Sequence, residues 1–77
     1  MRIEEHHGKK IVCGHIFPIS EFEPGQRWQA SGGATVIITK VDVANDRIHY
    51  AWQDAGGVNV HTKECFAFQC RYCKIVD

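Results

Sequence analysis

Residues 34–43, ATVIITKVDV, decide the fold, because they form the strongest strand candidate in the chain. The segment is rich in Val, Ile and Thr and contains neither Gly nor Pro, which is typical of a β-strand. A period of two puts one half of its side chains on each face: Ile37, Thr39, Val41 and Val43 on one, and Val36, Ile38, Lys40 and Asp42 on the other. Both faces are apolar at the start, so we expect the first half of this strand to be covered on both sides.

Shorter strand candidates flank this segment. Residues 26–29 precede it, and residues 47–53 follow it with Ile48, Tyr50 and Trp52 predicted to point inward. Turn signals at 31–33, 44–46 and 54–57 separate the candidates, and two further strands are predicted at 58–61 and 71–76. Thr62 is predicted to cap a single helical turn before the last strand. Five short strands joined by tight turns predict an all-β fold, a small five-stranded barrel with a short helical turn before the last strand.

The chain is short enough for one domain only, with 77 residues. We expect residues 22–77 to form the barrel domain and residues 1–21 to form an N-terminal arm with an edge strand, since Pro18 restricts a strand there to an edge. A chain of this size buries only about 60% of the surface that its unfolded form exposes. A metal ion, a disulfide or a partner chain would therefore help to stabilise it.

The charge is balanced, with nine basic and nine acidic residues and a formal net charge of +0. Proteins whose main task is to grip phosphate backbones usually carry a clear basic excess, and acidic mimics of DNA carry the opposite one. No apolar run approaches the roughly 20 residues that cross a bilayer, and residues 1–10 lack the apolar region of a secretory signal. We therefore expect a cytoplasmic protein without a membrane partner.

The segment Pro24-Gly25-Gln26-Arg27-Trp28, followed by the strands at 35–43 and 47–52 and the tail at 66–76, resembles SH3-like barrels. It is most similar to the short "PGQ-x-W" barrels that bacteriophages and prophages encode. The resemblance covers roughly residues 22–76 and rests on spacing. It implies an SH3-like barrel and, if the protein is phage-encoded, action in the host cell cytoplasm. Residues 30–34 lack the acidic and aromatic cluster of peptide-binding SH3 domains, so binding of proline-rich peptides is not implied.

Four cysteines form the most distinctive chemical pattern. Cys70 and Cys73 have the spacing of a zinc-ligand pair, and Cys13 and His15 would supply a second pair, with Cys65 as a substitute ligand for His15. Three thiolates and an imidazole would make a closed, structural zinc site. Alternatively, the cysteines are small core residues or surface thiols, or two of them form a disulfide. If residues 70–73 are extended, the two side chains point to opposite faces and do not share a metal.

The sequence predicts that the protein is not an enzyme. Cys–His catalysis needs a thiolate, a base within hydrogen-bond reach and an oxyanion site. His15 lies near Cys13 and His61 near Cys65 in the sequence, but no Asp or Asn stands out to orient either imidazole. A domain this small also offers little room for a substrate cavity.

Aromatic residues favour a protein-binding module instead. Most aromatics at inward strand positions belong to the core, but Phe66 and Phe68 are not easily buried together so near the C-terminus. We predict Trp52, Phe66 and Phe68 as interface anchors. Together with the resemblance, this predicts a phage-encoded adaptor or inhibitor of a host or defence complex.

Two other interpretations stay open. The first is a zinc-stabilised small barrel that binds nucleic acid through its local basic residues, Lys63, Arg71 and Lys74. An exposed strand edge or aromatic patch would equally support a homodimer.

Overall fold

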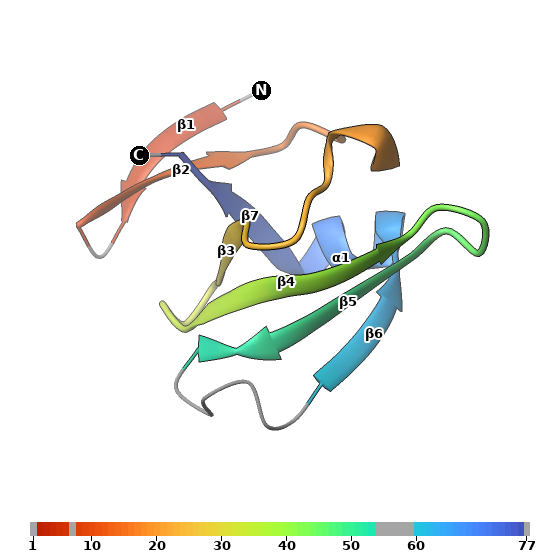
Figure 1. Cartoon of the computed structure of the whole chain (residues 1–77). Coiled ribbons are helices and arrows are strands. Elements are labelled where there is room, and N and C mark those ends of the chain that lie inside the picture. The colour runs from red at the N-terminus through yellow and green to blue at the C-terminus, as the bar shows by residue number, and fades with distance from the viewer. Residues whose placement is uncertain (1, 7, 54–59, 77) are drawn as a thin grey trace.

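The computed structural model describes residues 2–6, 8–53 and 60–76. In this part of the chain one antiparallel sheet contains seven strands in the order β1-β2-β7-β3-β4-β5-β6 (Figure 1). The elements are β1 (Arg2–His6), β2 (Lys9–Cys13), the 3-10 helix η1 (Ile19–Glu21), β3 (Arg27–Ala30), β4 (Thr35–Asp42), β5 (Arg47–Trp52), β6 (Val60–Glu64), α1 (Cys65–Arg71) and β7 (Tyr72–Ile75). The all-β prediction is confirmed.

The prediction of a five-stranded barrel is wrong in its strand count and its closure. The sheet is open, with β1 at one edge and β6 at the other. The two additional strands, β1 and β2, come from the charged N-terminal segment, where Gly8 has the positive φ of +77° that a tight turn favours. This hairpin joins the sheet because Ile11 and Val12 become buried where β2 pairs with β7.

A β-bulge changes the two faces of β4 halfway along the strand. The pairing with β5 shifts between Ile38 and Lys40. Before the bulge, Val36 and Ile38 are in the core, and after it Val41 packs against the same core. The prediction of strict alternation over residues 34–43 is therefore wrong after Ile38. The bulge inserts one additional residue, so the side chains that follow it point to the opposite faces.

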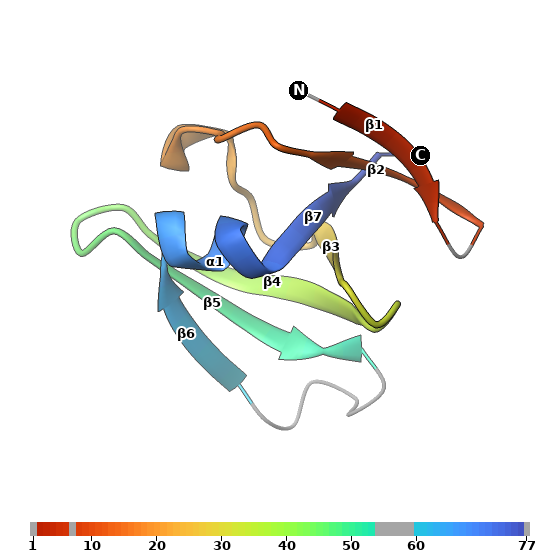
Figure 2. The same ribbon diagram turned by 180° about the vertical axis from the view of Figure 1, so that it is seen from behind.

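The main core lies between the sheet and α1, which packs against β5, β6 and β7 (Figure 2). Trp28 stacks on Phe22 with 5.1 Å between ring centroids, and Phe68 of α1 meets the edge of Trp28 at the same distance. The inward prediction for β5 is confirmed, since Ile48 and Tyr50 are buried and Trp52 packs against them. The buried cluster consists of Phe22, Trp28, Val36, Ile38, Ile48, Tyr50, Cys65, Phe68 and Tyr72.

The region around α1 departs from the sequence prediction. The helix begins at Cys65 after Glu64, and Thr62 lies in β6 and caps nothing. Val60 was predicted to point inward but is 56% exposed, because β6 is an edge strand. The turn expected at 54–57 and the strand position Val58 lie outside the described residues. Among the described residues, no helix has the length and apolar character needed to cross a bilayer.

Candidate functional site

The loop between β2 and η1 is held against α1 by the side chain of Gln69. The backbone N–H of Phe17 donates to Oε1 of Gln69 at 2.7 Å, and Nε2 of Gln69 donates to the carbonyl of Phe17 at 2.9 Å. One side-chain amide thus satisfies both backbone groups of a loop residue. Ile16, the residue before Phe17 in this loop, is 53% exposed.

Helix α1 has one buried side and one exposed side. Cys65 and Phe68 face the core, because residues three apart lie on the same side of a helix. Phe66, Ala67, Cys70 and Arg71 are exposed, and Phe66 leaves 62% of its surface open. A short helix pinned to the core on one side therefore presents a large aromatic ring to solvent on the other.

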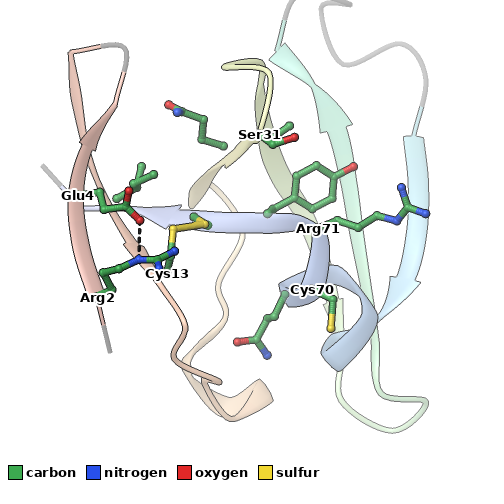
Figure 3. A pocket seen from close by; sticks show the side chains of 12 residues that line it. Arg2, Glu4, Cys13, Ser31, Cys70 and Arg71 are labelled. Carbon is green, nitrogen blue, oxygen red and sulfur yellow. Dashed lines mark hydrogen bonds and ion pairs between the residues drawn. A yellow bond between two sulfur atoms is a disulfide. The ribbon is translucent and has the colours of Figure 1, made fainter.

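A groove runs beside the C-terminal end of α1. It has a volume of about 410 Å³ and is lined by Ala30, Ser31, Trp52, Cys70, Arg71 and Tyr72. A second cavity of about 320 Å³ shares the residues from β3 and α1 and continues to the Cys13–Cys73 disulfide and to Arg2 and Glu4 (Figure 3). The two cavities share five lining residues, Ala30, Ser31, Cys70, Arg71 and Tyr72, and we refer to them together as the α1 groove.

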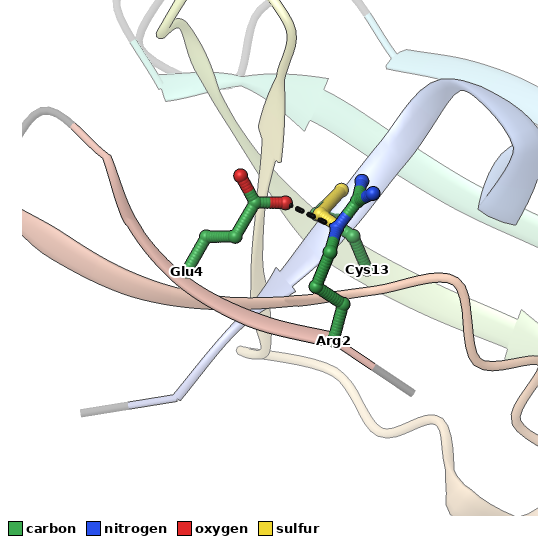
Figure 4. Close-up of polar contacts among 4 residues, drawn as sticks. Arg2, Glu4 and Cys13 are labelled. Atoms are coloured by element: carbon green, nitrogen blue, oxygen red, sulfur yellow. Dashed lines mark hydrogen bonds and ion pairs between the residues drawn. A yellow bond between two sulfur atoms is a disulfide. The ribbon is translucent and has the colours of Figure 1, made fainter.

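The two arginines of the α1 groove differ in their partners. The Nε of Arg2 donates to Oε2 of Glu4 at 2.7 Å, so its charge is balanced by an exposed ion pair (Figure 4). Arg71 is exposed, and no described carboxylate pairs with it. The groove therefore has a cationic group available at the end nearest Trp52.

The structure separates the three predicted interface anchors. Phe68 is fully buried among Trp28, Tyr50 and Tyr72, so its ring is occupied by the core. Phe66 is exposed and Trp52 is half-buried in the wall of the α1 groove. Of the three, Phe66 and Trp52 therefore present surface to a partner.

The four cysteines take three different roles. Cys13 and Cys73 form a disulfide, Cys65 is buried, and Cys70 is exposed. Helix α1 ends at Arg71 and β7 begins at Tyr72, so Cys70 and Cys73 belong to different elements. His15 is exposed and its ring meets the edge of Phe17. Within the described ranges, no group of three or more His, Cys, Asp or Glu side chains is arranged to hold a metal ion.

The buried titratable groups are poor candidates for chemistry. Burial raises the pKa of the Cys65 thiol, although a hydrogen bond from Gln69 acts in the opposite direction. Burial, reinforced by a hydrogen bond with Tyr72, raises the pKa of the Tyr50 hydroxyl. Both groups stay protonated at neutral pH, and neither is an activated nucleophile.

The predicted basic residues come from three different elements. Lys74 of β7 lies over the ring of Phe17, with 4.9 Å from Nζ to the ring centroid. Arg71 is the last residue of α1 and lines the α1 groove. Lys63 lies on the edge strand β6.

Two contributors to the site were missed by sequence reasoning. Gln69 carries no recognisable signal in the sequence, since its role depends on a loop 52 residues earlier in the chain. The sequence predicts Ser31 only as a turn residue, yet it lines both parts of the α1 groove. No periodicity or motif signals such contacts, because each is created by the packing of distant segments.

Comparisons of the chain with models of protein families, with curated proteins and with solved structures found no match.

Proposed function

We propose that the protein is a non-enzymatic protein-binding module that docks its partner on the exposed side of α1 and in the α1 groove beside it. The observation that carries this proposal is the position of Phe66. It is exposed on a helix whose other side is fixed in the core.

An aromatic side chain in this position supports tight binding. Aromatic residues supply much of the energy of protein interfaces, and a side chain on an anchored helix loses little conformational freedom when a partner binds. Ala67 is the next residue of the helix and is also exposed, and Ile16 is exposed in the loop that Gln69 holds against α1. These residues form the apolar half of the proposed docking face.

The α1 groove supplies the polar half and indicates the chemistry of the partner. Trp52 is half-buried in its wall and offers aromatic surface, and Arg71 offers a charge that no described carboxylate neutralises. An arginine in such a position can bind a carboxylate with two parallel hydrogen bonds. We infer a partner that places an apolar side chain on Phe66 and an Asp or Glu side chain on Arg71.

The SH3-like resemblance and the role as a phage-encoded adaptor or inhibitor stay predictions. What supports the resemblance is that β3 to β7 are five short strands with a helix before the last of them, to which the N-terminal hairpin is added. The inference about a phage and a host complex rests on the residues from Pro24 to Trp28 and their spacing alone.

The zinc-stabilised nucleic-acid-binding barrel has less support. Two of its four proposed zinc ligands are joined in a disulfide. A protein that grips a phosphate backbone usually carries a clear basic excess, whereas this chain has a formal net charge of +0.

Affinity capture from a cell lysate tests the proposed docking face. The wild-type protein, Phe66→Ala and Ile3→Ala serve as baits, since Ile3 is as exposed as Phe66 but lies on β1. We expect a protein that the wild type and Ile3→Ala recover equally and that Phe66→Ala loses. If no recovered protein depends on Phe66, the proposed docking face is wrong.

A further inference from the structure

The Cys13–Cys73 disulfide joins two neighbouring strands at the point where the N-terminal hairpin meets the rest of the sheet. Cys13 ends β2 and Cys73 lies in β7, with 5.2 Å between their Cα atoms. Their positions continue the antiparallel register set by Ile11 with Ile75 and Val12 with Lys74. The bridge closes a chain segment with a sequence separation of 60 residues.

Apart from the bridge, the described contacts that hold this hairpin to the sheet are the packing of Ile11 and Val12, which are buried, and a few polar contacts. Two residue pairs connect β2 with β7, and the N–H of Val76 donates to the carbonyl of Lys10 at 2.8 Å. Nζ of Lys9 donates to Oγ1 of Thr35 at 2.7 Å. Strand β1 pairs with β2 and lies at the edge of the sheet, so it depends on β2 for its position.

The bridge can be reached from outside. Cys13 and Cys73 are half-buried and line the cavity of about 320 Å³ in the α1 groove, and Figure 3 shows the two sulfur atoms at its wall. Arg71 and the Arg2–Glu4 ion pair line the same cavity. A small thiol that carries carboxylates would find access there, and its attraction would come from Arg71, because Glu4 balances the charge of Arg2.

We propose that the Cys13–Cys73 bridge is a thiol-exchange site, opened by a small acidic thiol that enters the α1 groove, and that its opening releases the N-terminal hairpin. This inference rests on the bridge and the cavity, and it does not depend on the proposed partner.

The chemistry needs two equivalents of the external thiol. The first attacks one sulfur of the bridge as a thiolate, so that a mixed disulfide forms and the bond between Cys13 and Cys73 breaks. The cysteine that leaves takes up the proton that the first thiol lost. The second thiol attacks the mixed disulfide, which frees the other cysteine and forms the disulfide of the external thiol. Two external thiols are oxidised, one protein disulfide is reduced, and the reverse sequence closes the bridge.

Release of the hairpin would uncover a second, smaller apolar region. Ile11, Val12 and Ile75 are buried in the closed state. Since β3, β4, β5 and α1 hold the main core without the hairpin, we expect this core to stay folded after reduction. Reduction of the bridge would thus release the end of the sheet formed by β1 and β2 and leave the part formed by β4 and β5 folded.

The test uses mixtures of reduced and oxidised glutathione at neutral pH, without denaturant. At each ratio, thiol exchange is stopped with acid, free thiols are alkylated with N-ethylmaleimide, and the mass of the protein is measured. Amide hydrogen exchange is followed in parallel by mass spectrometry. We expect the bridge to titrate without denaturant, and amides of residues 2–13 to exchange at least about tenfold faster in the reduced protein. Amides of β4 and β5 should keep their protection.

Two variants control for other causes. Cys70→Ser removes the exposed thiol that lines the same cavity, and it should titrate like the wild type. Cys13→Ser/Cys73→Ser should show the fast exchange of residues 2–13 without glutathione. If that variant does not fold, the reduced wild type still decides the question. The proposal is overturned if the bridge resists glutathione until the protein unfolds, or if reduction leaves the protection of residues 2–13 unchanged.

Discussion

The side-chain amide of Gln69 and the backbone of Phe17 are joined by two hydrogen bonds of 2.7 and 2.9 Å across 52 residues of sequence. Through this contact the helix that carries Phe66 also positions the loop that carries Ile16. The proposed docking face would therefore combine two segments that Gln69 joins through these hydrogen bonds.

Replacing this glutamine should weaken the fold measurably. Gln69→Ala leaves the backbone N–H and C=O of Phe17 without their partner, and unsatisfied groups of this kind cost about 1–3 kcal/mol. We expect a loss of that size in the free energy of unfolding, measured with urea. The exposed Gln53 provides a matched control, since Gln53→Ala should change the value by less than about 0.5 kcal/mol. Equal effects of the two substitutions would contradict the role of Gln69.

The two phenylalanines of α1 should differ sharply in their effect on stability. Phe68 is fully buried and Phe66 is 62% exposed, although they are two residues apart. Phe68→Ala should lower the free energy of unfolding by about 3–5 kcal/mol, because it leaves a cavity in the core. Phe66→Ala should stay within about 0.5 kcal/mol of the wild type in the same urea titration. A large loss for Phe66→Ala would mean that this ring supports the fold rather than a partner.

The sequence predicted the centre of the sheet because local patterns determine it. The alternation of Ile48, Tyr50 and Trp52 is read correctly without knowledge of any neighbour. The bulge after Ile38 was not predictable, because nothing in residues 34–43 marks where β5 shifts its register. The N-terminal hairpin was missed since Arg2, Glu4 and Glu5 look like part of a solvated tail. Edge strands carry charged side chains of the same kind, because these oppose pairing with another chain.

The candidate site was predictable only in part, because it is built from long-range contacts. The exposed position of one of the two phenylalanines was expected from their spacing near the C-terminus. The pairing of Cys13 with Cys73 requires β2 to lie beside β7, and residues 1–21 carry no signal for that neighbour. The groove requires the turn after β3 to lie beside the end of α1.

The stability of the protein should fall in alkaline solution because of Tyr50. Burial raises the pKa of this hydroxyl, so Tyr50 stays protonated in the folded protein at pH values where the unfolded chain ionises. Its contribution is fully present below the ordinary tyrosine pKa of about 10 and is lost as the pH rises above it. Above that pH, ionisation of this one group in the unfolded chain should lower the free energy of unfolding by about 1.4 kcal/mol per pH unit.

Tyr50→Phe isolates that contribution. The variant should show a shallower decline of the free energy of unfolding above about pH 10 than the wild type, because one titrating group has been removed. The raised pKa of Cys65 acts in the same direction and is unchanged in both proteins. Identical pH profiles would show that Tyr50 is not protected from ionisation.

The zinc hypothesis leads to a prediction about redox state. Zinc binds thiolates, and the sulfur atoms of Cys13 and Cys73 are not thiolates while they are bridged. We therefore expect a chelator to leave the melting temperature of the oxidised protein unchanged. Native mass spectrometry with and without chelator, before and after reduction, checks this. Zinc bound to the oxidised protein would show that the bridge and the metal site do not compete.

The most direct test of the docking face attaches a photo-crosslinker to Cys70, the exposed thiol on the same side of α1 as Phe66. Cys65 is buried, so a short maleimide reaction labels Cys70 first. The matched control carries the label on β6, through Thr62→Cys in a Cys70→Ser chain. In a cell lysate, we predict that the label at Cys70 crosslinks one partner protein, that Phe66→Ala abolishes this product, and that the label at position 62 does not form it. Equal crosslinking from both positions, or a product that survives Phe66→Ala, would contradict a docking face on α1.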